Sequence, residues 1–227
     1  TTGEKAGLWG TVTNTNLEIL EQASSGYISV DVAAADVTLT LSQGATSNGK
    51  NLFFKLTGTL AANRQFIMPA SAERVYVVQD ATVRGASNRT LSVLTASSSN
   101  PVPIPPGATI LVYSDGTDTS LGLLTKGYAT ITDTNSPYTA VAGAQIFANT
   151  TSDPITINLP AGVVGDEITL IDTRATWASN NVTVDSNGAE TINGSTDNLV
   201  LSNNGQALTL VYIDSTRGWS YKTNYTS

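Results

Sequence analysis

The side chains with the most potential for chemistry are carboxylates, because the 227-residue chain contains neither histidine nor cysteine. This composition removes the commonest general base and metal ligand, and it removes thiolate nucleophiles, thiolate metal sites and disulfides. Acid catalysis would then need two carboxylates that converge on one cleft. Most aspartates instead lie singly among turn residues, as do Asp133, Asp153, Asp166, Asp172 and Asp197. We therefore expect no enzyme activity and no catalytic residues.

Two segments could still group carboxylates. Asp185-Ser-Asn187-Gly188-Ala-Glu190 has the alternating oxygen ligands of a partial calcium loop, but a full EF-hand loop needs more ligands and two flanking helices. Because Asn-Gly is the strongest two-residue hairpin signal, we interpret this segment as a turn. Asp115-Gly-Thr-Asp118 could pair two carboxylates, but Asp and Gly are ordinary turn residues at the end of a strand. We predict no metal and no cofactor.

Aromatic side chains offer a second kind of site, a platform on which sugar rings stack. The candidates are Trp9, Trp177, Trp219, Tyr113, Tyr212 and Tyr221. Trp219 and Tyr221 alternate on one predicted strand, which favours a place in the core or at a subunit interface. Trp177 lies among Thr, Ser and Asn in a predicted loop, so it is the best candidate for an exposed contact with a glycan.

Composition indicates a β-rich protein and limits its partners. Charged residues make up 13% of the chain, about half the usual share, and Thr, Val, Asn and Gly suit strands and turns. The net charge is −7 and Lys and Arg are not clustered, which argues against nucleic-acid binding. No run approaches the roughly 18 apolar residues of a membrane span, so we expect no membrane partner.

Short runs of alternating apolar and polar residues predict strands that occur in two similar sets. Three pairs of segments can be aligned: 65–70 with 156–161, 74–80 with 167–173, and 110–115 with 210–214. This duplication predicts an all-β fold of two tandem small antiparallel β-sandwich or β-prism modules. We place the first module at residues 26–126 and the second at 127–227, with the polar segment 115–126 as linker or crossover.

Residues 1–25 form a separate N-terminal segment. Thr15 and Glu18 fit a capping box, which predicts a short helix over residues 16–24 that carries Leu17 and Leu20 on one stripe. A helix of two to three turns is marginal alone in water, so it must pack either on its own domain or against a sister subunit. We predict that Trp9, Leu17 and Leu20 form an attachment or oligomer contact.

The N-terminal segment also resembles a known protein family. Gly3-Glu4, Gly7, Trp9-Gly10, Asn14 and Asn16 match a GE-x-x-G-x-WG-x-x-x-N-x-N pattern found near the start of structural proteins of tailed bacteriophages, especially marine and cyanobacterial ones. The strand segments that follow are similar to β modules of phage surface and fibre proteins. In that family a short stretch usually precedes the pattern, so we expect residues before Thr1.

The resemblance implies a non-enzymatic structural protein on the virion surface. It implies a homotrimer that contacts other virion proteins, either tail proteins as the base of a fibre or appendage, or the major capsid protein as a decoration protein. The family pattern contains no catalytic residues. The alternative from another class is a carbohydrate-binding module that contacts host surface glycans. A glycan depolymerase would need a carboxylate pair in a groove, which the sequence does not show.

Overall fold

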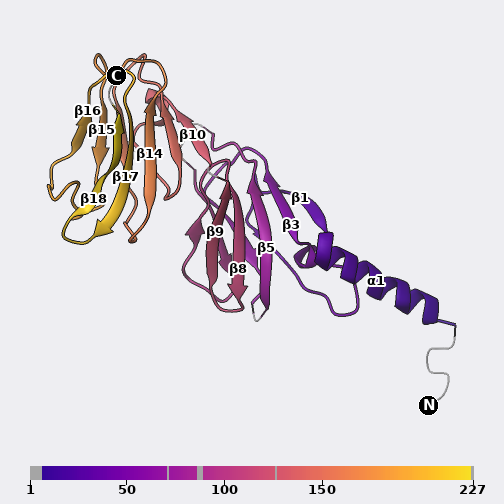
Figure 1. Cartoon of the computed structure of the whole chain (residues 1–227). Helices are drawn as coiled ribbons and strands as arrows, with labels where there is room; N and C mark the ends of the chain where they lie inside the picture. The colour runs from indigo at the N-terminus through magenta and orange to yellow at the C-terminus, as the bar shows by residue number, and fades with distance from the viewer. Residues whose placement is uncertain (1–6, 71, 86–88, 126, 226–227) are drawn as a thin grey trace. The chain divides into compact units, whose positions relative to one another are not determined.

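The computed structural model describes residues 7–70, 72–85, 89–125 and 127–225, so Gly3 and Glu4 of the phage-like pattern lie outside the described residues. Within these ranges the chain forms one α-helix, two short 3-10 helices and eighteen strands (Figure 1). They divide into two compact units. The first lies within Thr1–Val83, Thr90–Ile104 and Thr109–Leu124, and the second within Arg84–Arg89, Pro105–Ala108 and Thr125–Ser227.

The first unit winds like a β-solenoid between two sheets. One sheet has the order β1 (Tyr27–Asp31), β3 (Phe53–Thr57), β5 (Glu73–Asp80), β8 (Thr109–Asp115) and β9 (Thr119–Thr125). The other has the order β2 (Val37–Thr38), β4 (Arg64–Met68), β6 (Leu91–Thr95) and β7 (Val102–Pro103). From β1 to β6 each successive strand adds to the opposite sheet, and neighbours within each sheet are parallel. Antiparallel β7 and β8 then follow.

The second unit repeats this topology strand for strand. One sheet has the order β10 (Tyr128–Ile131), β12 (Gln145–Ala148), β14 (Glu167–Asp172), β17 (Ala207–Asp214) and β18 (Gly218–Tyr225). The other has the order β11 (Tyr138–Thr139), β13 (Ile155–Asn158), β15 (Val182–Asp185) and β16 (Leu199–Leu201). The 3-10 helices η1 (Asn48–Lys50) and η2 (Asp133–Asn135) lie in connections.

The prediction of antiparallel modules is wrong for most strand pairs, because the strands from β1 to β6 and from β10 to β15 pair in parallel. Alternation with period two reports which face of a strand is buried, and it carries no information on the direction of the neighbouring strand. The predicted linker at 115–126 is also wrong, since residues 119–125 form strand β9.

The duplicated segments correspond, although two of the three alignments are shifted. By strand register Ile110 corresponds to Leu208, so segment 110–115 does not align with 210–214. In β5 the buried residues include Tyr76 and Asp80, and in β14 they include Ile168 and Asp172. Asp80 therefore corresponds to Asp172, not to Thr173 as the sequence alignment had it. The difference matters because a shift of one residue moves every side chain to the opposite face of a sheet.

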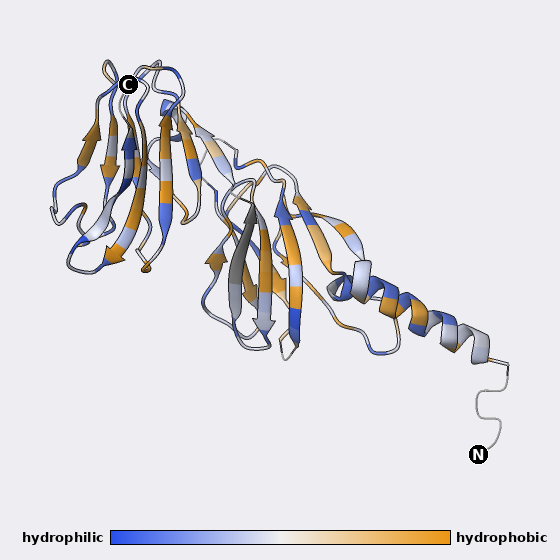
Figure 2. Cartoon of the chain, viewed as in Figure 1, coloured by the Kyte–Doolittle hydropathy of each residue, from blue (hydrophilic) through white to orange (hydrophobic). Residues whose placement is uncertain are grey.

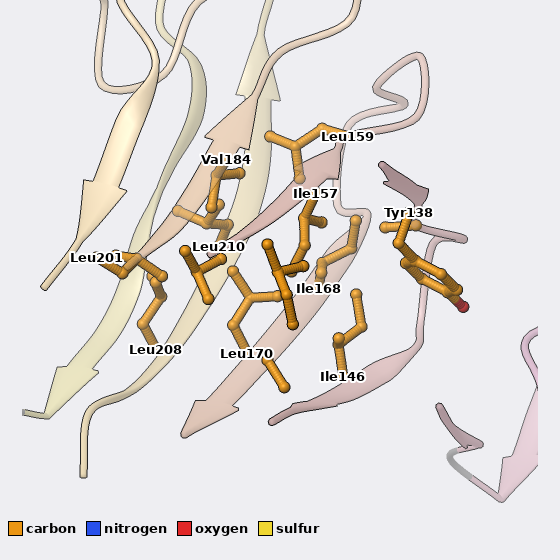
Figure 3. Packing of buried hydrophobic residues seen from close by; sticks show 14 of the residues in the cluster. Tyr138, Ile146, Ile157, Leu159, Ile168, Leu170, Val184, Leu201, Leu208 and Leu210 are labelled. Atoms are coloured by element: carbon orange, nitrogen blue, oxygen red, sulfur yellow. The ribbon is translucent and has the colours of Figure 1, made fainter. Parts of the chain in front are cut away.

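Each unit buries its core between its two sheets. In the second unit the core joins Ile146, Ile168, Leu170, Leu208 and Leu210 of one sheet to residues of the facing sheet (Figure 3). Those facing residues are Tyr138, Ile157, Val184 and Leu201. In the first unit, Phe54 of β3 meets Phe66 of β4 edge to face at 5.2 Å, which connects the two sheets in the same way.

Helix α1 (Trp9–Ser25) begins two turns earlier than predicted. Thr15 and Glu18 lie inside it, and its N-cap residue Leu8 makes no side-chain cap hydrogen bond, so the capping-box prediction is wrong. At the other end, the Gly26 N–H donates to the Gln22 carbonyl oxygen at 3.0 Å. No described helix is long and apolar enough to cross a membrane.

Candidate functional site

The strongest candidate for a functional surface is helix α1, because none of its residues is buried. Trp9 is 77% exposed, Leu17 59% and Leu20 64%. The helix meets the rest of its unit near η1, where Gln22 Oε1 accepts a hydrogen bond from the Ser47 N–H at 3.2 Å. The helix was expected to pack either on its own domain or against a sister subunit, and its own domain covers none of these three apolar side chains.

The apolar residues of α1 share one side of the helix. With about 100° between successive residues, Trp9, Asn16 and Leu20 lie at the centre of an arc that covers about half of the circumference. Val12 and Ile19 border this arc on one side, and the opposite side of the helix carries Asn14, Glu18 and Glu21. Figure 2 shows hydrophobic and hydrophilic residues side by side along α1. We call this arc the apolar face of α1.

The carboxylates of both segments accept hydrogen bonds that hold the fold. Glu190 Oε1 accepts a hydrogen bond from the Gly162 N–H at 2.9 Å, and Glu190 Oε2 accepts one from Trp219 Nε1 at 3.3 Å. Gly188 has φ +60°, as expected for the turn that we predicted there. Across the described ranges no group of three or more acidic residues is arranged to hold a metal ion.

Asp115 also organises a turn. Its Oδ1 accepts hydrogen bonds from the N–H groups of Thr117 and Asp118, both at 2.7 Å. These bonds, first that from Asp118, hold the pKa of the Asp115 carboxyl below its usual value. An acid catalyst at neutral pH needs a raised pKa, so the environment of Asp115 is the opposite of what this role requires.

The prediction of an exposed Trp177 is wrong, since its side chain has no exposed surface. The cause is a buried carboxylate that the sequence analysis grouped with ordinary turn residues. Asp172 Oδ2 accepts hydrogen bonds from the N–H groups of Thr176 at 3.0 Å, Trp177 at 3.3 Å and Gly205 at 3.0 Å. These bonds fold the polar loop over the sheet end and turn the indole into the core. Trp219 is buried as well, in agreement with a place in the core, whereas Tyr221, which was predicted to share its face, is 42% exposed.

The sequence analysis missed a second exposed apolar surface. On the outer side of the β1-β3-β5-β8 sheet, Tyr27 lies opposite Phe53, Phe53 opposite Val77, and Val77 opposite Leu111. Next to this row, Val75 of β5 lies opposite Tyr113 of β8. We call the surface formed by these six residues the outer face of the first unit. A signal was present in the sequence, because Val75–Val78 and Ile110–Tyr113 are continuous apolar runs, which are typical of strands covered on both faces.

Comparison with known proteins places the chain in a family. Residues 113–226, from the end of β8 through β18, match the family described as "Bacteriophage T4 gp9/10-like protein, N-terminal". This match defines the class as structural proteins of the phage virion, of the tail type. Since it covers half of the 227 residues, the chain belongs to the T4 gp9/10-like family. The resemblance to phage structural proteins is thereby confirmed, and the marine or cyanobacterial type stays a prediction.

Other comparisons add little. A search of curated proteins finds no match. A solved structure titled "Structure of a chaperone-substrate complex" is 11% identical, with a TM-score of 0.37. The alignment covers 86% of this chain and 36% of that one. A likeness this weak carries no argument about the fold or function of the chain.

Proposed function

We propose that the chain is a non-enzymatic, oligomeric structural protein of a phage tail, and that helix α1 joins its copies. The observation that carries the proposal is the uncovered apolar face of α1, which belongs to a chain of the T4 gp9/10-like family. A 17-residue helix gains most of its stability from packing rather than from its own hydrogen bonds. A helix with no buried residue therefore needs a partner.

The width of the apolar face supports a bundle of more than two helices. A helix that meets one partner needs only a narrow stripe of apolar residues, whereas a helix that meets two neighbours needs a wider one. The apolar face of α1 covers about half of the helix, which suits the homotrimer that the phage resemblance implies. Asn16 at its centre would fix the register of the bundle, as a single buried asparagine does in coiled coils.

A location in the tail is supported by the family, as the base of a fibre or appendage that contacts other tail proteins. Decoration of the capsid remains the rival location, and labelling of intact particles with an antibody to the chain would distinguish the two. A glycan-binding role loses its candidate residue, because the indole of Trp177 is enclosed in the core.

Light scattering on the full chain tests the proposal. The wild type should have three times the 23.6 kDa mass of one chain. Replacing Trp9, Leu17 and Leu20 together by serine should give monomers. The matched control replaces Asn14, Glu18 and Glu21 by serine on the opposite side of α1, and it should keep the wild-type mass. A monomeric wild type, or an unchanged mass after the first set of substitutions, would refute the proposal.

A further inference from the structure

The outer face of the first unit is unusual for a solvated sheet face. Tyr27 is 58% exposed, Val75 44%, Leu111 37% and Tyr113 45%, and they lie on neighbouring strands in register with Phe53 and Val77. A sheet that faces water on one side normally carries polar residues there. Large contiguous apolar patches are rare on the surfaces of monomeric proteins, and where they occur they mark interaction sites.

The second unit provides an internal comparison, because the same strands occur there in the same order. Phe53, Val77 and Leu111 form one row across the first sheet. Their counterparts, set by the register of the buried residues, are Gln145, Thr169 and Thr209. These three apolar residues thus have polar counterparts, whereas Tyr27, at the end of the row, corresponds to Tyr128, which is 59% exposed.

At the neighbouring outer pair the contrast is partial, because only one of its two positions is polar in the second unit. Val75, opposite Tyr113, corresponds to Glu167, opposite Val211. In the second unit the Oγ1 atoms of Thr169 and Thr209 lie 3.0 Å apart and share a hydrogen bond, so this row can be polar in the same fold, although the second unit keeps an aromatic pair, Tyr128 stacked on Phe147, on its outer face. The core and the topology therefore do not require Phe53, Val77 and Leu111 to be apolar.

We propose that the outer face of the first unit packs against the same face of other copies of this chain and continues the contact made by α1. This inference rests on the proposed oligomer, and it names a second surface within it. Helix α1 ends at Ser25 and β1 begins at Tyr27, so the two apolar surfaces follow each other along the chain with one residue, Gly26, between them.

The exposed area supports one interface made of both surfaces. A fully exposed large side chain presents roughly 150–250 Å², so the exposed fractions of the four sheet residues correspond to roughly 300–450 Å², the size of the largest patch on an ordinary monomer. Adding Leu8, Trp9, Leu17 and Leu20, also exposed, raises the total to roughly 650–1,100 Å². A stable interface buries about 800 Å² on each partner, which the sheet face alone does not reach.

Cysteine labelling tests the inference in the assembled protein, because the native chain has no cysteine. We would compare Leu111→Cys with Thr209→Cys, which is the corresponding position of the second unit, using a maleimide dye on the full chain. The Leu111→Cys thiol should react at least about tenfold more slowly than the Thr209→Cys thiol. Its rate should recover when Trp9, Leu17 and Leu20 are also replaced by serine, because monomers expose the face. Equal rates in an oligomeric protein would overturn the inference.

A second variant gives the first unit the residues of the second. The double variant Val77→Thr and Leu111→Thr reproduces the Thr169–Thr209 pair. It should raise the protein concentration at which half of the oligomer has dissociated at least about tenfold. It should not lower the melting temperature of the monomer. Val164→Thr with Val200→Thr, at exposed sites of the second unit, is the matched control and should change nothing. A monomeric wild type would refute both this inference and the proposed function. An oligomer that depends on α1 alone would refute only this inference, and one that depends on the sheet face alone would refute only the role of the helix.

Discussion

The buried Asp172 carboxylate should be among the most important polar groups for the stability of the second unit. Besides its three bonds at Oδ2, its Oδ1 accepts a hydrogen bond from the Arg174 N–H at 3.1 Å. A net hydrogen bond to a charged group contributes about 1.5–3 kcal/mol, and a buried donor left without a partner costs a similar amount. Because some of the four donors can reach water, we expect Asp172→Ala to lower the free energy of unfolding by about 3–5 kcal/mol.

A graded series makes this prediction specific. Asp172→Asn keeps the shape of the side chain and can keep an oxygen at the Oδ2 position, so it should cost about 1.5–3 kcal/mol. Asp214 is the matched control, because it also accepts two backbone hydrogen bonds, from Thr216 at 2.8 Å and Arg217 at 2.6 Å. That turn is exposed, so water can replace the carboxylate, and Asp214→Ala should cost at most about 1 kcal/mol.

Urea unfolding of the full chain, followed by tryptophan fluorescence, measures these differences. Trp177 and Trp219 are both buried in the second unit, so their emission reports on its transition. The reasoning is refuted if Asp172→Ala lies within about 0.5 kcal/mol of the wild type, or if Asp214→Ala is equally damaging. The first result would mean that the loop carrying Trp177 is held by its apolar contacts and not by the carboxylate, and the second would mean that burial of the turn does not decide the cost.

Two further changes test other parts of the second unit. Trp177→Ala should lower the free energy of unfolding by about 3–5 kcal/mol, as expected for a large core side chain; a glycan-binding defect in a variant of wild-type stability would show that the indole is a surface contact after all. Burial raises the pKa of the Tyr138 hydroxyl to about 12, although Arg84 opposes the shift. Since its unfolded pKa is about 10, the native state keeps the proton longer, and stability should fall by on the order of 2–3 kcal/mol between pH 10 and 12. Urea titrations at pH 9 and 12 should show a smaller loss for Tyr138→Phe than for the wild type, and parallel losses would contradict this assignment.

Strand positions could be predicted from the sequence, but strand partners could not. Alternation located β14 and β17 because each has one buried face, and the repeated pattern located their counterparts β5 and β8. Parallel and antiparallel neighbours bury the same alternate residues, so the solenoid-like winding left no local trace. The shifted alignment of Arg74–Asp80 arose because both faces of β5 carry apolar residues, which makes the two registers look alike.

The candidate sites show the same division between local and distant information. The burial of Trp177 depends on Asp172, on Gly205 and on the core beneath, which are spread over more than thirty positions of the chain. A window of polar neighbours therefore gave the wrong environment for the indole. The start of α1 was missed for a different reason: Thr11, Val12 and Thr13 are poor helix formers, so the capping box at Thr15 looked like the first turn.

The duplication separates what the fold needs from what the assembly needs. Inner positions stay apolar in both units, as with Tyr76 and Ile168, because each pair of sheets must enclose a core. Outer positions are free of that demand, and several of them differ in kind between the units, as Leu111 does from Thr209. Exposed apolar side chains gain nothing in an isolated chain and favour association. The apolar outer face therefore has a physical rationale only if another surface covers it, and the neighbouring uncovered helix makes a further copy of the chain the simplest cover.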